Sequence, residues 1–274
     1  MSERSDEPIY VGYLPAPARH GRLVRIAVPA IALLALAVGV GAALSQRDPG
    51  PGVWSDGSAE SFRGVLVERP YPMLVPADGP PLLLVEMSKR GAQGRVAGLD
   101  GQSVEATGWP LTREGRRMLE LSPEPDALRE LETPVRAAVV EMLSQGSATL
   151  VGEIVDSKCY LGAMKPGDGK GHKACATLCV TGGIPPVLVT FDKDGAAVGF
   201  YLIADEAGDG ANAIAAPFLG EPVEVSGTLA SYAGMQVLRV RADGISVRSS
   251  AKREPAAPGT VAADSPRRVN QGVR

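Results

Sequence analysis

The stretch that decides the fold occurs twice in the chain, as Gly101-Gln-Ser-Val-Glu-Ala-Thr-Gly108 and as Gly220-Glu-Pro-Val-Glu-Val-Ser-Gly227. The match continues without a gap to Leu119 and Leu238. In each copy a β-branched segment is followed by a glycine-containing turn and a second apolar segment, which is the pattern of a β-hairpin. An internal repeat of this kind predicts two copies of one small β-fold.

Two more blocks recur in the same order. Gly64-Val-Leu-Val-Glu68 matches Gly152-Glu-Ile-Val-Asp156, and Pro80-Pro-Leu-Leu-Leu-Val85 matches Pro185-Pro-Val-Leu-Val-Thr190. Each copy has five short strands, and in the second copy residues 211–218 can form one or two helical turns between the third and fourth strands. That is the plan of the OB-fold. We therefore expect a mainly β protein with two tandem OB-like five-stranded barrels, a degenerate one at 60–122 and a second at 148–247.

An uncharged run of 21 residues, Ile26–Gln46, precedes the barrels. About 20 apolar residues are enough to cross a bilayer as a helix. Arginines flank its N-terminal side, which by the positive-inside rule keeps the N-terminus in the cytoplasm. We expect a cytoplasmic head at 1–25, a transmembrane helix at 26–46 and a periplasmic bulk. The alternative is a signal peptide cleaved after Ser45.

The remaining segments connect or end these parts. Turn formers predict a linker at 47–59, and the composition of 248–274 predicts a disordered tail. Residues 123–147 are expected to form a connecting helix, because Pro134–Leu143 carries one apolar face between Thr133 and Gly146. The Ala, Gly and Arg content indicates a GC-rich bacterium, and hence the bacterial inner membrane. The net charge of −3 and the lack of a basic, aromatic-rich face speak against nucleic acid as a partner.

All three cysteines lie close together in the second copy, as Asp156-x-x-Cys159, twelve residues, then His172-x-x-Cys175-x-x-x-Cys179. Thiolates with one imidazole are ligands for zinc, copper or iron–sulfur centres. On a helix beginning near His172, Cys175 and Cys179 share a face with it. We expect Cys159, His172, Cys175 and Cys179 to bind a metal, with Asp156 orienting the imidazole from behind.

The two copies differ mainly at this cluster. When the three repeated blocks are aligned, the second copy has 17 additional residues between its first and second strands. It has 14 more between the Pro-Pro block and its fourth strand. Tyr71 stands where the second copy has Cys159. A feature present in one copy alone is not needed to fold the barrel, so the added segment is the best candidate for the function.

A disulfide is the alternative to a metal, because exported cysteines tend to oxidise. Cys175 and Cys179 would pair poorly on a regular helix, whose i,i+4 Cβ atoms lie about 5–6 Å apart. A disulfide prefers about 3.8 Å between its Cβ atoms. Cys159 with either helix cysteine is a better pair, and one thiol then stays free.

The segment from Gly152 to Tyr160, followed by His172-Lys-Ala-Cys-Ala-Thr-Leu-Cys179 and Gly182-Gly-Ile-Pro-Pro186, resembles a family of uncharacterised bacterial exported proteins. The resemblance covers residues 148–245 and implies a membrane-tethered OB-like domain with a shared site. The architecture also resembles the haem chaperones of cytochrome c maturation, but their haem-attaching histidine motif is missing from this chain.

These observations predict a membrane-anchored periplasmic protein with a Cys3His metal site, accessory to a membrane redox enzyme or subunit. A thiol–disulfide protein that uses Cys159 and a helix cysteine is the second hypothesis. The third is a non-catalytic scaffold whose barrels bind another subunit.

Overall fold

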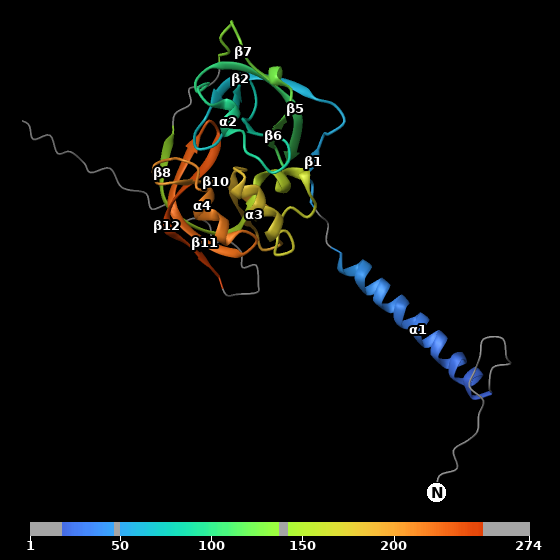
Figure 1. The fold of residues 1–274 in the computed structure, drawn as a ribbon. Helices are drawn as coiled ribbons and strands as arrows, with labels where there is room; N and C mark the ends of the chain where they lie inside the picture. Colours follow the sequence, from blue (N-terminus) through green and yellow to red (C-terminus); the bar gives the residue numbers. More distant parts are fainter. Residues whose placement is uncertain (1–17, 47–49, 137–141, 249–274) are drawn as a thin grey trace, which may run out of the picture. The chain divides into compact units, whose positions relative to one another are not determined.

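The computed structural model describes residues 18–46, 50–136 and 142–248. It shows a long N-terminal helix and, as a separate compact unit, two closed five-stranded barrels (Figure 1). Helix α1 (Ala18–Ser45) has 28 residues with Pro29 inside it. Its stretch His20–Ser45 has a mean hydropathy of 2.4 and is long enough to cross a membrane. Such a helix fits either a single membrane anchor or a signal sequence.

The first barrel closes in the order β2-β3-β4-β6-β5, with β5 pairing back to β2. Its third and fifth strands are parallel, and its other neighbours are antiparallel. Its elements are β2 (Glu60–Val67), β3 (Met73–Pro76), β4 (Leu82–Val85), α2 (Gln93–Val96), β5 (Ser103–Arg113) and β6 (Arg116–Leu121). Three short elements flank it: β1 (Val53–Trp54), η1 (Pro125–Ala127) and β7 (Leu128–Glu130), of which β1 and β7 pair with β5.

The second barrel closes in the equivalent order β8-β9-β10-β12-β11, again with its third and fifth strands parallel. Its strands are β8 (Leu143–Asp156), β9 (Pro186–Phe191), β10 (Ala197–Asp205), β11 (Pro222–Tyr232) and β12 (Met235–Val247). The expected helical turns lie between β10 and β11, as α4 (Asn212–Ala215) and η3 (Ala216–Phe218). The connection from β8 to β9 carries η2 (Cys159–Ala163) and α3 (Lys173–Thr181). The prediction of two OB-like barrels is confirmed.

The strand registers reproduce the sequence repeat. Gly64 pairs with Val104 in the first barrel, and Gly152 pairs with Val223 in the second. In both barrels the glycine lets a neighbouring strand approach closely, because a Cβ there would overlap the carbonyl oxygen of a valine in the second strand. The first and third repeated blocks are therefore structurally equivalent.

The middle block of the repeat is not structurally equivalent in the two barrels. Pro80 and Pro81 precede β4, the third strand of the first barrel, whereas Pro185 precedes β9, a second strand. A double proline followed by an aliphatic run fits any strand that is buried on both faces, so the pattern could not tell the second strand from the third. The second strand of the first barrel is β3, which has only four residues and shows no period in the sequence.

The registers also give the size of the added segment. The numbers of equivalent residues differ by 88 in the first strand (Gly64 and Gly152) and by 114 in the second (Val75 and Val189). The second barrel thus has 26 more residues between these strands, rather than 17. From the third strand onward the difference is 119, which leaves only five extra residues in the β9–β10 hairpin.

Two expected segments differ in the structure. Residues 134–136 are not helical and Leu143 begins β8, so the helix expected over Pro134–Leu143 is wrong at both ends; residues 137–141 lie outside the described part. The long strand β11 explains this, because it pairs with β8 as far as Leu143. Within the expected linker, Val53 and Trp54 form β1 on the edge of β5.

Alternation along the strands separates three apolar cores. In β4, Leu82 and Leu84 point into the first barrel, whereas Leu83 and Val85 point out of it into a core shared with the second barrel. A third core fills the second barrel. Cys159 and Cys179 belong to the shared core. The cysteines are therefore placed between the barrels.

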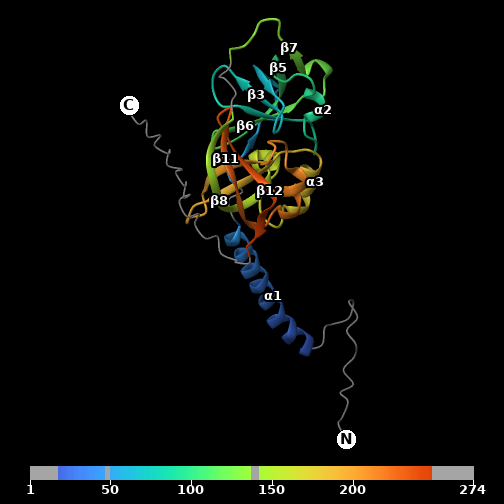
Figure 2. The same ribbon diagram turned by 90° about the vertical axis from the view of Figure 1, so that its left-hand side faces the viewer.

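Each barrel inserts the segment that follows its first strand into the other barrel. The Tyr71 hydroxyl donates to the Ile203 carbonyl and accepts from the Ala211 amide, both at 2.8 Å. In return, the Lys158 ammonium donates to the carbonyl of Glu86 at 2.9 Å and of Ser88 at 2.6 Å. The barrels stack along this contact, with α2 and α3 on the same side (Figure 2).

Candidate metal centre

The Asp-x-x-Cys spacing places Asp156 where its carboxylate contacts both the start of η2 and the residue before α3. Asp156 ends β8, and its Oδ1 accepts a hydrogen bond of 2.8 Å from the Cys159 amide, which fixes the start of η2. Its Oδ2 lies 2.9 Å from Nε2 of His172, the residue before α3. Asp156 is fully buried and His172 is 4% exposed. The carboxylate is therefore in direct contact with the imidazole, which is the contact that the expected orienting role requires.

Helix α3 presents two faces to two cores. Ala176 and Val180 pack inside the second barrel, whereas Cys175 and Cys179 face the core that the barrels share. The expected one-face arrangement of the helix cysteines is thus present. Cys179 is buried and Cys175 is half-buried, so Cys175 is the thiol nearest to solvent.

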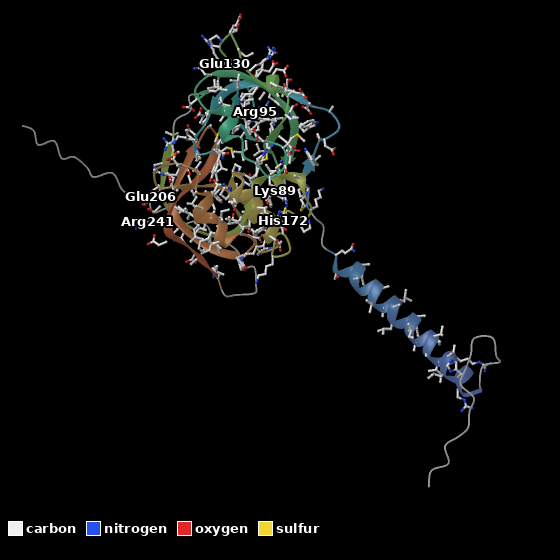
Figure 3. The ribbon with its side chains drawn as sticks, in the orientation of Figure 1. Lys89, Arg95, Glu130, His172, Glu206 and Arg241 are labelled. Carbon is white, nitrogen blue, oxygen red and sulfur yellow. The ribbon has the colours of Figure 1, made fainter. Side chains whose placement is uncertain are left out.

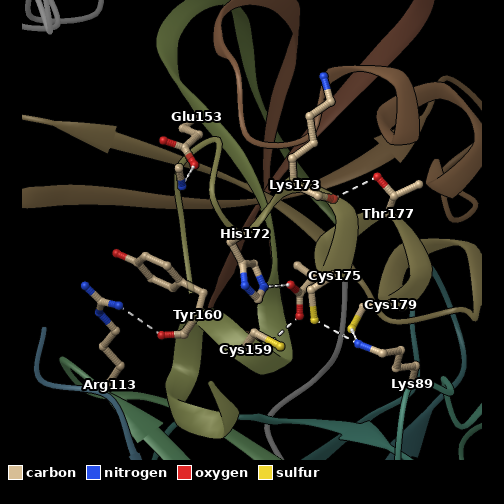
Figure 4. Close-up of polar contacts among 12 residues, drawn as sticks. Lys89, Arg113, Glu153, Cys159, Tyr160, His172, Lys173, Cys175, Thr177 and Cys179 are labelled. Carbon is tan, nitrogen blue, oxygen red and sulfur yellow. Dashed lines mark hydrogen bonds and ion pairs between the residues drawn. The ribbon is translucent and has the colours of Figure 1, made fainter. Parts of the chain in front are cut away.

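The five residues come together as two overlapping groups of donor atoms. In one group, the Sγ atoms of Cys159 and Cys175 and a ring nitrogen of His172 all lie within 4.8 Å of one another. In the other, the same holds for Asp156, Cys159 and Cys179. Cys159 belongs to both groups, and all three cysteines are free thiols. The arrangement is a buried Cys/His cluster that could hold a metal ion (Figure 4).

Two of the thiols differ in acidity. A hydrogen bond between Cys159 and Cys179 raises the pKa of Cys159, and burial and the Asp156 carboxylate raise it further. The same hydrogen bond lowers the pKa of Cys179, with help from the positive charge of Lys89. The two thiols therefore differ in acidity, and Cys179 is the more acidic of the pair.

The first barrel contributes a side chain that sequence reasoning missed. The Lys89 ammonium, in the loop after β4, lies 2.8 Å from Sγ of Cys175 and 3.8 Å from Sγ of Cys179. This contact raises the pKa of Lys89, mainly through the hydrogen bond to Cys175. Figure 3 shows Lys89 and His172 near the junction of the two barrels. No local pattern identifies Lys89, because its partners lie 86 and 90 residues away.

The glycine pair after α3 was the available signal. The Gly182 carbonyl accepts a hydrogen bond of 2.9 Å from the Gly91 amide, and a Cβ on Gly182 would overlap the Lys89 carbonyl oxygen. Gly183 adopts a φ of +98°, which favours glycine. The pair turns the chain after α3 and also admits the loop that carries Lys89.

On the other side of the cluster, Tyr160 fixes η2 to the first barrel. The Arg113 guanidinium stacks on the Tyr160 ring, with Cζ 3.8 Å from the ring centroid, and donates to the Tyr160 carbonyl at 3.0 Å. Burial raises the pKa of Tyr160 to about 12. The charged run 113–117 forms a hairpin whose tip is at Glu114 and Gly115, and Arg113 at its base packs against the Cys159 segment.

Fold and site together define a class: a double OB-like barrel protein with an N-terminal apolar helix and a buried Cys/His cluster between its barrels. Comparison of the chain with protein-family models, with curated proteins and with solved structures gives no significant match.

Proposed function

We propose that this protein binds a metal ion through Cys159, His172, Cys175 and Cys179. The observation that carries the proposal is the convergence of these donors, from the end of β8 and from α3, into two groups within 4.8 Å that share Cys159. Three thiols and an imidazole are a soft donor set, which suits zinc, copper or an iron–sulfur centre. Asp156 contacts Nε2 at 2.9 Å, so an ion would bind Nδ1 if that hydrogen bond is kept.

We further propose that the protein is a single-pass protein of a bacterial inner membrane, with its barrels in the periplasm and a role beside a membrane redox enzyme. The apolar helix α1 supports the anchor. The half-buried Cys175 supports exchange with a partner, because it gives the cluster one accessible edge. The resemblance to bacterial exported proteins that share the Cys/His signature points to the same compartment.

Elemental analysis tests the proposal directly. The full-length chain, purified in detergent without oxidation, is expected to bind one equivalent of metal per site. Cys159→Ser, Cys175→Ser and Cys179→Ser should each lose most of it, because each removes a ligand. Val198→Ser is a matched control, since Val198 is 58% exposed on β10. Wild-type protein with all thiols reduced and no metal under saturating zinc would contradict the proposal.

A second candidate function is thiol–disulfide exchange, and it is favoured by the free sulfurs of Cys159 and Cys179, which lie within 4.8 Å of each other. A partner disulfide would be reduced to two thiols while Cys159 and Cys179 form a disulfide, so that two electrons and two protons pass to the partner. In that case Cys159→Ser and Cys179→Ser would be equally inactive in thiol exchange, and Cys175→Ser would retain activity. Loss of metal in all three variants instead supports the metal site.

A further inference from the structure

Lys89 is the part of the site that the first barrel supplies. Its loop is held against the second barrel from both ends: Lys158 donates to the carbonyls of Glu86 and Ser88, and the Gly91 amide donates to Gly182. Ser88 takes a positive φ of 65°, which turns the chain just before Lys89. The ammonium is thus delivered to Cys175 by a fixed backbone, although the lysine side chain itself is flexible (Figure 4).

The contact between Lys89 and Cys175 matters because of the net charge that the site would carry with a metal bound. Three thiolates and one neutral imidazole around a divalent ion leave one net negative charge. An uncompensated charge in a site that is largely removed from water is costly. One ammonium at hydrogen-bond distance from a ligand sulfur makes the total zero and donates an N–H···S bond.

Neighbouring cations are already engaged. Among the described residues of these segments, Lys158 pairs with Glu120, Lys170 and Lys173 pair with Glu221, and Arg90 pairs with Glu86. The contacts of the Lys89 ammonium are to sulfur. Lys89 is therefore the cation that the fold assigns to the cysteines.

We propose that Lys89 is a positioning residue of the metal centre, which balances the charge of a divalent ion bound by Cys159, His172, Cys175 and Cys179. The inference rests on the proposed function and extends it, because it makes the site a product of both barrels and selects a divalent ion. The first barrel then has a role in binding and is more than a scaffold.

The test compares Lys89→Met, Lys89→Arg and the control Arg90→Met in the full-length, reduced protein in detergent. Zinc affinity is measured by competition with a chromophoric chelator, and Co²⁺ is used as a spectroscopic probe. Loss of a charge-assisted hydrogen bond should weaken zinc binding roughly tenfold in Lys89→Met. The sulfur-to-cobalt charge-transfer band should move to lower energy, because a sulfur without its N–H donor gives up electrons more easily.

Lys89→Arg keeps the charge and a donor, so it should restore affinity to within about threefold of wild type. Arg90→Met should bind like wild type. If the wild type binds zinc and Lys89→Met shows the same affinity and the same cobalt band, the role of Lys89 is overturned and the metal site stands. If the wild type binds neither ion, the proposed function fails, and the role of Lys89 fails with it.

The contact itself can be tested without metal. o-Phthalaldehyde joins an amine and a thiol that lie side by side into a fluorescent isoindole, with release of two waters. Metal-free wild type should give an isoindole that links Lys89 to Cys175 by mass spectrometry. The same product should be missing from Lys89→Met and Cys175→Ser. Its absence from correctly folded wild type would overturn the contact on which the inference rests.

Discussion

Lys158 of the second barrel and Glu120 of the first form an ion pair with 2.7 Å between Nζ and Oε2, and their side chains are 5% and 3% exposed. The pair is enclosed between the barrels, next to Cys159. A buried pair is costly to break from one side, because the remaining charge has no water to solvate it.

We therefore expect Lys158→Met to lower the free energy of unfolding by about 3–5 kcal/mol. The measurement is denaturant unfolding of the full-length protein in detergent. The double variant Lys158→Met/Glu120→Leu should recover much of this loss, because it leaves no orphaned carboxylate. A double variant as unstable as the single one would show that the charge is not the cause.

Tyr71→Phe should destabilise the protein without touching the cysteines. It removes the partner of the Ile203 carbonyl and of the Ala211 amide, and unsatisfied buried polar groups cost about 1–3 kcal/mol. Thermal or denaturant unfolding checks this. Tyr232→Phe, at a half-buried tyrosine, is the control and should stay within about 0.5 kcal/mol of wild type. Metal affinity should be unchanged in both variants at temperatures where they are folded.

Asp156→Asn should weaken metal binding by about 10- to 100-fold, the usual effect of losing the carboxylate behind a ligating histidine. Asparagine can still accept the hydrogen bond from the Cys159 amide, so the start of η2 should survive. Zinc competition measures the effect, with Asp194→Asn on an exposed turn as the control. Equal affinities in the two variants would exclude His172 as an oriented ligand.

Gly182→Ala should separate the loop of Lys89 from α3, because the added Cβ overlaps the Lys89 carbonyl oxygen. Overpacking of this kind costs about 1–3 kcal/mol. Gly94→Ala is the matched control, since a Cβ there meets nothing within 4 Å and the residue lies inside α2. The free energy of unfolding and the isoindole yield with o-phthalaldehyde should both fall in Gly182→Ala. Both should stay unchanged in Gly94→Ala.

The N-terminus of the mature protein separates a retained anchor from a signal peptide. We expect intact-mass spectrometry of the membrane fraction to show a chain that still contains residues 26–46. A soluble chain that begins near Gln46 would show instead that the apolar helix is a cleaved signal peptide.

Much of the fold was predictable because the sequence contains two copies of the same β-fold, which can be compared with each other. Gly64 and Gly152 occupy equivalent registers, and hairpin glycines such as Gly115 and Gly234 take positive φ in both barrels. Local turn chemistry therefore identified all five strands of the second copy and four of the five in the first. The short strand β3 was missed, since four residues are too few to show a period.

The cluster was predictable for the residues that lie close together in sequence. Asp156, Cys159, His172 and the two helix cysteines were expected to lie close together. The structure brings them together as two groups of three that share Cys159, and that the four expected ligands hold one ion stays a prediction. Lys89 was not predictable, since its approach to Cys175 depends on how one barrel docks on the other. The helix expected at Pro134–Leu143 failed for a related reason, because pairing with β11 outweighs the local helical pattern at Leu143.

The long sequence separation between Lys89 and Cys175, 86 residues, has a consequence for the biogenesis of the protein. Contacts between distant residues form late in folding. Cys159, Cys175 and Cys179 can meet as soon as the segment from β8 to α3 has folded, whereas Lys89 arrives only when the barrels dock. Cys159 and Cys179 are buried in the core that the barrels share, so the thiols stay open to solvent until the barrels dock. If the barrels fold in an oxidising compartment, as proposed above, the speed of docking would set how many molecules keep their cysteines reduced.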